Sequence, residues 1–476
     1  MKLITDDIHN EPKLVETIKI PDNLPFTPYP FQLEDIAIIG KRKRVLIGHD
    51  MGLGKTFICI IIGNSIDLPK LVIAPESLRL NWLREIKSIV PSADVKVLYS
   101  QDDILNFSFG KDWTIVGYST ATKFISYLIH FQCVFVDEAH KCKAVDNWGK
   151  PASKRANTVL ELSENAEYCY LVTGTPIPTR NKDLYNLLKM LKVEEIDFEE
   201  ERAFYKFGME YCAGHKTYWG HDFNGCTHSA RLHDILSKYM VRRRKKDVLD
   251  YLKKQRSFIP LNIADKQIRD IHKSLKRADN MQTFLGSAMT GRRLMSLHKV
   301  SSCIDFVESI LESGESVVIV SEFVETIEAL RTHYGSQCCI VKGGMDDNKK
   351  TKSVDEFQAG RKKICLLSLS AGGVGITLTK SEKMVIMDFD WTPANMIQME
   401  DRICRIGQKN PCNIYYLYGA DCYLDSYFVE MLTEKNKNID KVVDMADNQL
   451  DLMDSRETGQ SFMEYLKEKL GVAFGK

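Results

Sequence analysis

Short apolar runs rich in β-branched residues recur along the chain, and each run ends in polar or glycine-rich residues. Helix-like segments of about 10–20 residues separate the runs, which is typical of parallel sheets covered by helices on both faces. The runs fall into two series, at 45–48, 71–74, 114–118, 133–136 and 170–173, and at 317–321, 338–341, 364–369, 384–388 and 413–418. The pattern predicts an α/β fold with two parallel sheets, whose ligands bind beyond the carboxyl ends of the strands.

Residues 185–300 interrupt this alternation with charged, helix-like sequence that separates the two series. The tail after residue 435 is polar and helix-forming, with apolar residues at helical spacing over 462–470. We therefore expect a first lobe over 1–184, a helical insertion or linker over 185–300, a second lobe over 301–434 and a helical tail over 435–476.

The first strand leads into His49-Asp50-Met51-Gly52-Leu53-Gly54-Lys55-Thr56 and then an apolar helix. The Gly-Lys-Thr end is that of a phosphate-binding loop, although His49 replaces the first glycine of the strict pattern. Glycines let backbone N–H groups surround phosphates, and the following helix points its positive end at them. We expect residues 50–56 to bind ATP, with Lys55 at the β- and γ-phosphates and the Thr56 hydroxyl on Mg²⁺.

A second element places two adjacent carboxylates at the end of an apolar strand. Asp137 and Glu138 follow Val134-Phe135-Val136, and charged groups there are costly unless something nearby needs them. Asp137 suits the coordination shell of Mg²⁺, and Glu138 can orient or deprotonate an attacking water. The alternative is an acidic helix N-terminus, which the phosphate-binding loop upstream disfavours. The two elements together indicate hydrolysis of a nucleoside triphosphate.

Segment 392–407 predicts a helix, because it opens with Thr-Pro and closes with glycine. Gln398, Arg402 and Arg405 fall on one face of that helix, at i, i+4 and i+7. The apolar residues Met396, Met399, Ile403 and Ile406 lie on a neighbouring face that can pack against the sheet. The arginines are either solvated surface groups or, opposite an ATP site, arginine fingers for the charge of the transition state.

Global charge does not indicate a nucleic-acid binder. The 476 residues include 65 Lys and Arg against 64 Asp and Glu, for a formal net charge of +1, so any phosphate-binding surface must be local. Two basic runs, 41–44 and 242–246, are candidates, and the second contains Arg243 and Arg244. A solvated face explains each run equally well.

The 13 cysteines are scattered, and no apolar signal segment precedes them. The longest apolar stretch, 57–62, is far shorter than the roughly 18 residues that a membrane span needs. We expect a reduced, soluble, intracellular protein with no membrane association.

A possible metal site lies within 212–228, which contains Cys212, His215, His221, Cys226 and His228. These residues include no C-x2-C or H-x3-H pair of the usual ligand spacing. We therefore expect a loop-rich insertion with incidental Cys and His residues, and no structural zinc.

With these motifs the chain resembles superfamily 2 helicases, specifically the Swi/Snf-like group, over residues 28–420. The resemblance implies two recombinase-like lobes and a DNA-dependent ATPase that uses ATP and Mg²⁺. It is carried by short motifs in the family's order, which are Pro30-Phe31-Gln32, Ile73-Ala74-Pro75-Glu76-Ser77-Leu78 with Trp82, Gly117-Tyr118-Ser119-Thr120, Leu171-Val172-Thr173-Gly174-Thr175-Pro176, Ser370-Ala371-Gly372-Gly373-Val374-Gly375 and Gln398 to Gln408. His49 stands where the family usually has an acidic residue, and Cys404 where it usually has histidine. Neither change removes a catalytic group.

The resemblance implies a role for each matched segment. Gln32 would recognise adenine, and Gly375 and Gln398 would join the nucleotide site. The implied catalytic set is Lys55, Asp137, Glu138, Arg402 and Arg405, with both arginines acting from the second lobe. The implied DNA contacts are Pro75, Ser77, Trp82, Tyr118, Ser119, Thr173, Gly174, Ser370 and Gly372, together with Arg243 and Arg244.

Swi/Snf-like members mostly move along duplex DNA and sense its charge and shape more than its bases. Segments 207–212 and 219–225 are similar to the subgroup of annealing helicases that remodel forks, and we expect no room for chromatin-binding modules. We expect a translocase on duplex, forked or four-way DNA that performs fork regression, branch migration or strand annealing. Small helicases of large bacteriophages are similar too, which would place it in bacterial cytoplasm, whereas a eukaryotic source implies the nucleus. A remodeller that displaces proteins from duplex DNA and a non-motor ATP switch are the alternatives.

Overall fold

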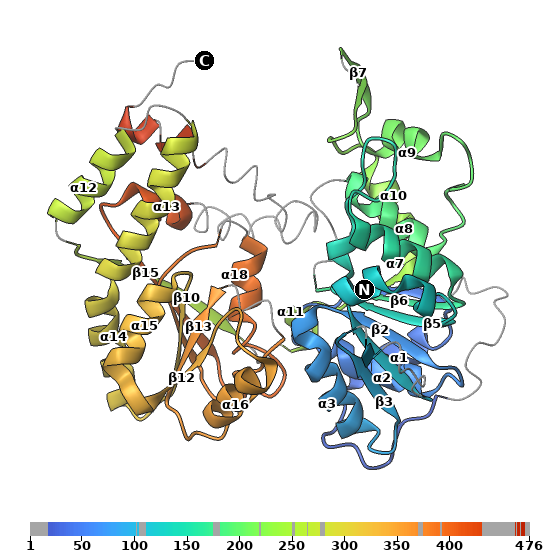
Figure 1. Cartoon of the computed structure of the whole chain (residues 1–476), viewed down its shortest axis with the longest axis horizontal. Helices are drawn as coiled ribbons and strands as arrows, with labels where there is room; N and C mark the ends of the chain where they lie inside the picture. Colours follow the sequence, from blue (N-terminus) through green and yellow to red (C-terminus); the bar gives the residue numbers. More distant parts are fainter. Residues whose placement is uncertain are drawn as a thin grey trace. The chain divides into compact units, whose positions relative to one another are not determined.

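The computed structural model describes residues 18–100, 102–103, 111–174, 181–218, 220–249, 253–263, 265–276, 281–369, 375–390, 393–430, 462, 464–466 and 468–471. Internal contacts divide the chain into two compact units, Met1–Arg244 (unit 1) and Lys245–Lys476 (unit 2) (Figure 1). Each unit contains a parallel sheet with helices, which confirms the α/β class predicted from the apolar runs.

The sheet of unit 1 has the order β3-β4-β2-β5-β6-β1-β9 in the described residues, and every pairing in it is parallel. Its strands are β1 Arg44–Ile47, β2 Lys70–Ala74, β3 Val95–Leu98, β4 Trp113–Gly117, β5 Cys133–Asp137, β6 Tyr168–Val172 and β9 Met240–Val241. Because all strands run the same way, the loops after β1, β2, β4, β5 and β6 meet at one edge of the sheet.

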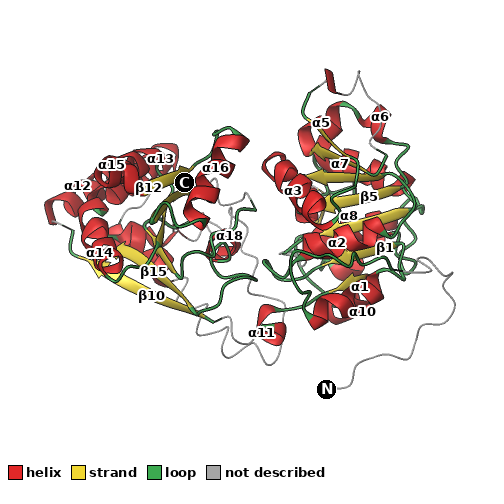
Figure 2. Ribbon diagram, turned by 90° about the horizontal axis from the view of Figure 1, so that it is seen from below, coloured by secondary structure: helices red, strands yellow, loops and turns green. Residues whose placement is uncertain are grey.

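Both faces of this sheet are buried, because alternate residues of each strand enter different apolar clusters. Leu46, Leu71 and Val134 belong to one cluster, whereas Val45, Val72 and Phe135 belong to the other. The helices around the sheet are visible in Figure 2 and comprise α1 Pro30–Ile39, α2 Lys55–Asn64, α3 Arg79–Ile89, α5 Tyr118–Lys123, α6 Ile125–Leu128 and α7 Lys154–Asn165.

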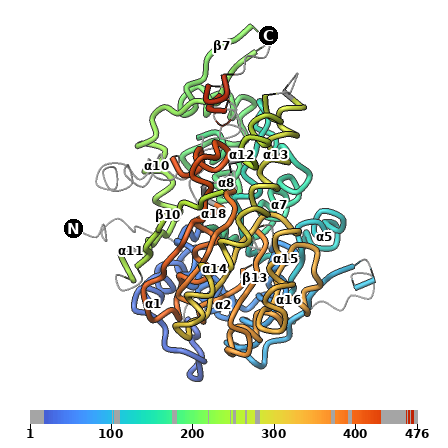
Figure 3. The backbone as a smooth tube through the Cα atoms, turned by 90° about the vertical axis from the view of Figure 1, so that its left-hand side faces the viewer, coloured from blue at the N-terminus to red at the C-terminus, as the bar shows by residue number. Residues whose placement is uncertain are grey.

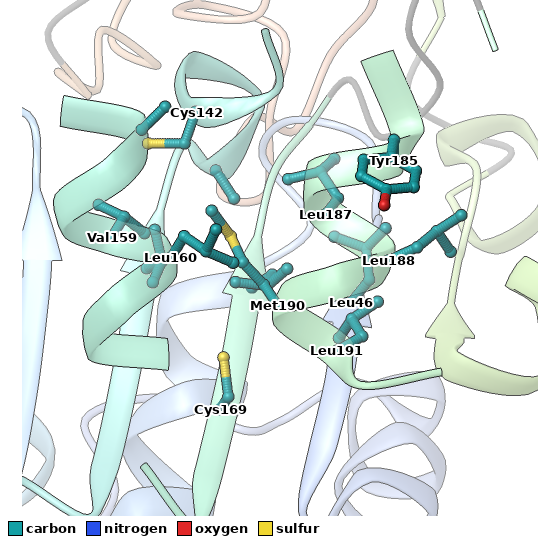
Figure 4. Close-up of a cluster of buried hydrophobic side chains, with 14 of the residues drawn as sticks. Leu46, Cys142, Val159, Leu160, Cys169, Tyr185, Leu187, Leu188, Met190 and Leu191 are labelled. Carbon is teal, nitrogen blue, oxygen red and sulfur yellow. The ribbon is translucent and has the colours of Figure 1, made fainter. Parts of the chain in front are cut away.

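Residues 184–241 complete unit 1. They form α8 Leu184–Leu191, α9 Ala203–Tyr211, the antiparallel hairpin of β7 His215–Thr217 and β8 Gly220–Asp222, α10 Ser229–Tyr239 and β9. Leu187, Leu188 and Leu191 of α8 share a cluster with Val159 and Leu160 of α7 (Figure 4). The segment is therefore part of the core of unit 1.

The sheet of unit 2 is also parallel, with the order β10-β15-β14-β11-β13-β12. Its strands are β10 Lys254–Leu261, β11 Val317–Ser321, β12 Cys338–Val341, β13 Ile364–Ser368, β14 Lys383–Ile386 and β15 Cys412–Gly419. Its helices, whose path Figure 3 traces, are α11 Lys245–Val248, α12 Asp265–Lys276, α13 Met281–His298, α14 Val300–Glu312, α15 Val324–Tyr334, α16 Asp347–Gln358 and α18 Pro393–Glu400.

The structure divides residues 185–300 between the two units. The part up to Val241 belongs to unit 1, and β10, α12 and α13 belong to unit 2. In the tail, the described residues Phe462, Leu466 and Leu470 are buried at the helical spacing that the sequence indicates.

Candidate active site

The phosphate-binding loop joins β1 to α2. Gly52 and Gly54 have φ angles of 78° and 79°, in the left-handed region that side chains rarely adopt. A Cβ atom at Gly54 would lie 2.3 Å from Gln32 Nε2, so only glycine allows this approach. Gln32 is 2% exposed and donates from Nε2 to the main-chain oxygen of Leu53 at 3.1 Å. The predicted adenine-recognising residue and the loop are therefore in direct contact.

Lys55 is the first residue of α2 and folds back over the loop. Its Nζ donates to the main-chain oxygens of His49 at 2.9 Å and Asp50 at 3.2 Å. Thr56 follows it in the first turn, where backbone N–H groups and the helix dipole favour an anion. A cation, a hydroxyl and a helix N-terminus at one place fit a magnesium-bound triphosphate.

The carboxylate pair lies at the carboxyl end of β5. Asp137 is the last residue of that strand, and Glu138 has a φ angle of 55°. Burial and the neighbouring Glu138 raise the pKa of Asp137 to about 7. A buried carboxyl oxygen whose charge is disfavoured by its surroundings fits a site that receives a divalent cation.

Glu138 has the opposite electrostatic environment. Burial disfavours its charge, but His140, Lys55 and Lys141 more than offset this and lower its pKa to about 2. His140 Nδ1 lies 3.2 Å from Glu138 Oε2 and 3.0 Å from Thr173 Oγ1. Glu138 is thus held as a carboxylate, the form that can accept a proton from water.

Thr173 and Gly174 follow β6 and approach the same loop. A Cβ atom at Gly174 would lie 2.6 Å from Met51 Cγ and 3.4 Å from Lys55 Nζ. The structure therefore brings together the segments after β1, β5 and β6, as their parallel order requires. Sequence reasoning missed His140, although its place two residues after Glu138 was a usable signal.

His49 and Asp35 form a buried pair behind the loop. His49 Nε2 lies 3.0 Å from Asp35 Oδ2, and both side chains are fully buried. Burial raises the pKa of Asp35, but His49 and Arg243 outweigh it and lower that pKa overall. His49, which departs from the family pattern, therefore pairs with the carboxylate of Asp35 on α1.

The basic runs are largely bound within their own units. Arg243 donates from Nε and Nη2 to Asp35 Oδ1 at 3.0 and 2.8 Å, and Nη2 also lies 3.1 Å from Glu34 Oε2. Arg44 donates to the main-chain oxygens of Ser163 and Met190, near the ends of α7 and α8. The guanidinium of Arg243 is therefore paired with two carboxylates, and its contact with DNA stays a prediction. Arg244 remains a prediction.

Two other predicted DNA contacts are internal. Trp82 is 1% exposed and Tyr118 is 2% exposed, and their contact with DNA stays a prediction. Pro75 and Thr173 are also buried, whereas Ser77 and Gly174 are partly exposed and Ser119 is exposed. The last three remain candidates for backbone contact.

In unit 2 the arginine segment differs from the helix predicted over 392–407. Helix α18 ends at Glu400 and the chain continues in turns, in which the N–H groups of Arg402 and Ile403 donate to the main-chain oxygens of Met399 and Glu400 at 3.0 and 3.2 Å. The main-chain oxygen of Arg402 accepts from Leu378 N–H at 2.9 Å. Arg402 is 7% exposed, and Arg405 is partly exposed with Nη1 3.4 Å from the main-chain oxygen of Ile376. Gly375 and Gln398 are partly buried, and the predicted contacts Ser370 and Gly372 lie outside the described residues.

A buried ion cluster fixes the turn after α18. Glu400 is fully buried and accepts from Arg256 Nε at 2.6 Å, from Tyr416 Oη at 2.7 Å and from Lys254 Nζ at 3.1 Å. Asp401 pairs with Lys245 at 2.7 Å and with Lys254. Lys245 therefore belongs to this cluster, although the sequence placed it in a basic run.

Within the described part of the chain, no helix has the length and apolar character needed to cross a membrane. The same residues include no cluster of three or more His, Cys, Asp or Glu side chains arranged to hold a metal ion. Within 212–228, where no structural zinc is expected, Cys212 is buried in the core of unit 1 and Cys226 is exposed.

Comparison with known proteins identifies two domain models in this chain. The SNF2-related domain matches residues 34–312, and the helicase conserved C-terminal domain matches residues 298–407. The mouse "DNA annealing helicase and endonuclease ZRANB3" is 27% identical over 447 residues, which cover 87% of this chain and 41% of that protein. The Xenopus tropicalis "SWI/SNF-related matrix-associated actin-dependent regulator of chromatin subfamily A-like protein 1" is 27% identical over 91% of this chain and 47% of its own length.

The chain thus spans less than half the length of these two relatives. Among solved structures, a Sulfolobus solfataricus SWI2/SNF2 ATPase core in complex with double-stranded DNA aligns with a TM-score of 0.43 and 18% identity, over 96% of this chain and 100% of that chain.

Proposed function

Because this chain belongs to the family of the SNF2-related domain, whose model matches residues 34–312, we propose that it is an ATP-driven DNA translocase that remodels branched DNA. The family implies use of a nucleotide. The observation that carries the proposal is the meeting of Gln32, Lys55 and the Asp137–Glu138 pair around one loop of unit 1.

Each of these residues has a chemical task in the proposed reaction. Gln32 binds the adenine, and Lys55 exchanges its two main-chain partners for the β- and γ-phosphates. The Thr56 hydroxyl and the Asp137 carboxylate would hold Mg²⁺, which would neutralise phosphate charge when bound. Glu138 orients the attacking water and accepts its proton, for which its lowered pKa provides the carboxylate form.

Unit 2 supplies further positive charge for the γ-phosphate. Arg405 and Arg402 act as arginine fingers on the γ-phosphate, with Gly375 and Gln398 beside the nucleotide. Such a finger accelerates hydrolysis by roughly 10³–10⁵. Because these residues are on different units, the proposed hydrolysis would depend on both units, and this dependence would make the ATPase a motor.

Branched DNA is proposed on two grounds. The mouse relative is named as a DNA annealing helicase and matches 87% of this chain. In addition, α9 and the β7–β8 hairpin carry the sequence that resembles the fork-remodelling subgroup. We place the activity where such DNA occurs, in bacterial cytoplasm or in a nucleus.

The test is the steady-state ATPase rate of the full chain without DNA and with single strands, linear duplex, forks and four-way junctions. We expect forks and junctions to stimulate most. Equal rates on every DNA would contradict the branched-DNA assignment, and a rate that no DNA changes would contradict the motor. Removal of a bound protein from linear duplex, without any change in forks, would favour the remodeller instead.

A further inference from the structure

Two side chains next to the predicted DNA-contact segments point inward and converge on Asp137. Trp82 Nε1 donates to Asp137 Oδ2 at 2.8 Å, and Tyr118 Oη donates to the main-chain oxygen of Asp137 at 2.5 Å. We propose that Trp82 and Tyr118 are positioning residues that transmit contact with the DNA backbone to the orientation of Asp137. This inference deepens the proposed function and rests on it.

The Trp82 contact fixes the plane of the carboxylate. Its ring is 1% exposed, and an indole N–H can only donate. The other oxygen of Asp137, Oδ1, accepts from the main-chain N–H of Glu138 at 2.9 Å. One donor on each oxygen sets how the group faces a cation, in the way that outer partners orient metal ligands generally.

The Tyr118 contact fixes the backbone of the same residue. Tyr118 opens α5, its ring is 2% exposed, and its hydroxyl also lies 3.4 Å from the main-chain oxygen of Glu138. Glu138 adopts a φ angle of 55°, a conformation that costs free energy in a residue other than glycine. The hydroxyl is therefore placed where it can stabilise the turn that separates the two carboxylates.

Both buried donors lie close in sequence to accessible backbone-contact candidates. Ser77 precedes α3, which carries Trp82, and Ser119 directly follows Tyr118. Glu76 ties the two segments together, since its Oε1 accepts from Ser119 N–H at 2.8 Å. Gly117 makes this possible, because a Cβ atom there would lie 2.9 Å from Glu76 Cγ. A phosphate that shifts either segment thus shifts a donor of Asp137.

The test uses Trp82→Phe in the full chain, which keeps an aromatic ring and removes the N–H. Affinity for ADP is measured by calorimetry at increasing Mg²⁺, DNA affinity by fluorescence anisotropy, and the ATPase rate with and without forked DNA. We expect Mg²⁺ half-saturation to rise roughly ten- to hundredfold, as for other partners of metal ligands. The ratio of DNA-stimulated to basal rate should fall several-fold, while DNA affinity changes by less than about twofold, because the ring does not reach the surface.

Trp113→Phe is the matched control. Trp113 is equally buried, but it begins β4, at the end of the sheet opposite Asp137. The Trp113→Phe variant should lose about as much packing as Trp82→Phe and leave the Mg²⁺ dependence of ADP binding unchanged. If Trp82→Phe fails to fold, Tyr118→Phe, which removes a single oxygen, gives the same two readouts. In the double variant the effects should be less than multiplicative, because both act through Asp137.

The outcomes separate this inference from the proposed function. Unchanged Mg²⁺ half-saturation and an unchanged stimulation ratio in Trp82→Phe and Tyr118→Phe would overturn the inference and leave the translocase standing. A wild-type chain that no DNA stimulates would overturn the translocase and, with it, the transmission of DNA contact. A fall in DNA affinity alone would return both residues to the DNA interface.

Discussion

Lys55 donates to two main-chain oxygens of its own loop, those of His49 and Asp50. A phosphate can replace these neutral acceptors and form stronger, charge-assisted hydrogen bonds. Lys55→Ala should therefore lower ATP hydrolysis at least about 10²–10³-fold and weaken nucleotide binding, as measured by steady-state rates and ADP titration. Lys238→Ala, which removes an exposed lysine paired with Glu195, should leave both unchanged. Normal turnover in Lys55→Ala would show that this loop is not part of the active site.

Arg243 illustrates a basic residue whose partners are internal. Replacement by Ala removes the guanidinium that now pairs with the buried Asp35 carboxylate and leaves His49 as its remaining partner in this group. The free energy of unfolding should fall by about 3 kcal/mol, as followed by urea denaturation, while the salt dependence of DNA binding stays as in the wild type. Arg231→Ala, an exposed counterpart paired with Glu210, should cost well under about 1 kcal/mol. A salt slope lowered by about one with no loss of stability would instead place Arg243 on DNA.

Lys55 and Asp137 could be proposed for the nucleotide site because each occurs in a compact motif with its own local chemistry. Gln32 is proposed only because its motif resembles that of the family. Their partners could not be found in that way, because the sheet brings distant segments together. Arg243 meets Asp35 across 208 residues, and Trp82 meets Asp137 across 55. The local sequence indicates which side chains can take part in binding or catalysis. The packing of the fold decides whether a basic or aromatic side chain faces DNA or the interior.

At the scale of elements, continuous apolar runs gave the central strands, because strands buried on both faces need no polar alternation. Strand β3 Val95–Leu98 escaped prediction since it is an edge strand and mostly half-buried. Strand β10 Lys254–Leu261 escaped because it carries Lys254 and Arg256, which look solvent-exposed until they meet Glu400. The helix was also predicted too long, since the residues after Glu400 form turns that contact Leu378 and this ion cluster.

The ion cluster after α18 predicts a pH dependence of stability. Burial opposes the charge of Glu400, but Lys254, Arg256 and Tyr416 outweigh it and lower its pKa below the usual value of 4.5. A carboxyl whose folded-state pKa is depressed contributes stability above its unfolded pKa and loses it as the pH falls through the folded value. Glu400→Gln should therefore lower the free energy of unfolding by about 3–5 kcal/mol near pH 7.

This difference between Glu400→Gln and wild type should stay constant down to about pH 5 and shrink below about pH 4.5. Urea titrations followed by circular dichroism across that range measure it. Glu308→Gln is a suitable control, since Glu308 is about half exposed and pairs with the exposed His333 at 3.2 Å. If the difference in the free energy of unfolding between the two proteins instead increased as the pH falls, Glu400 would be protonated in the folded protein.

At the scale of the whole molecule, the division at Arg244 and Lys245 places the motifs on separate units. The phosphate-binding loop and the carboxylate pair lie in unit 1, and the arginine segment lies in unit 2. The proposed roles of unit 1 in nucleotide binding and of unit 2 in catalysis can therefore be tested separately. Unit 2 can accelerate hydrolysis only if its residues stabilise the transition state more than they stabilise bound ATP. A motor of the proposed kind needs this difference.

Arg405 tests that requirement directly. It is partly exposed, whereas Arg402 is 7% exposed and contributes its main chain to the fold of unit 2. Arg405→Ala should therefore keep ADP and ATP affinity within about twofold and lower turnover by roughly 10³-fold or more, because a finger acts on charge that develops in the transition state. Arg402→Ala should lose stability as well as turnover. Arg331→Ala, an exposed arginine of α15, is the control and should change neither. If Arg405→Ala instead weakens nucleotide binding and leaves turnover at saturating ATP unchanged, the group stabilises the ground state and the transition state equally, and another residue must couple hydrolysis to unit 2.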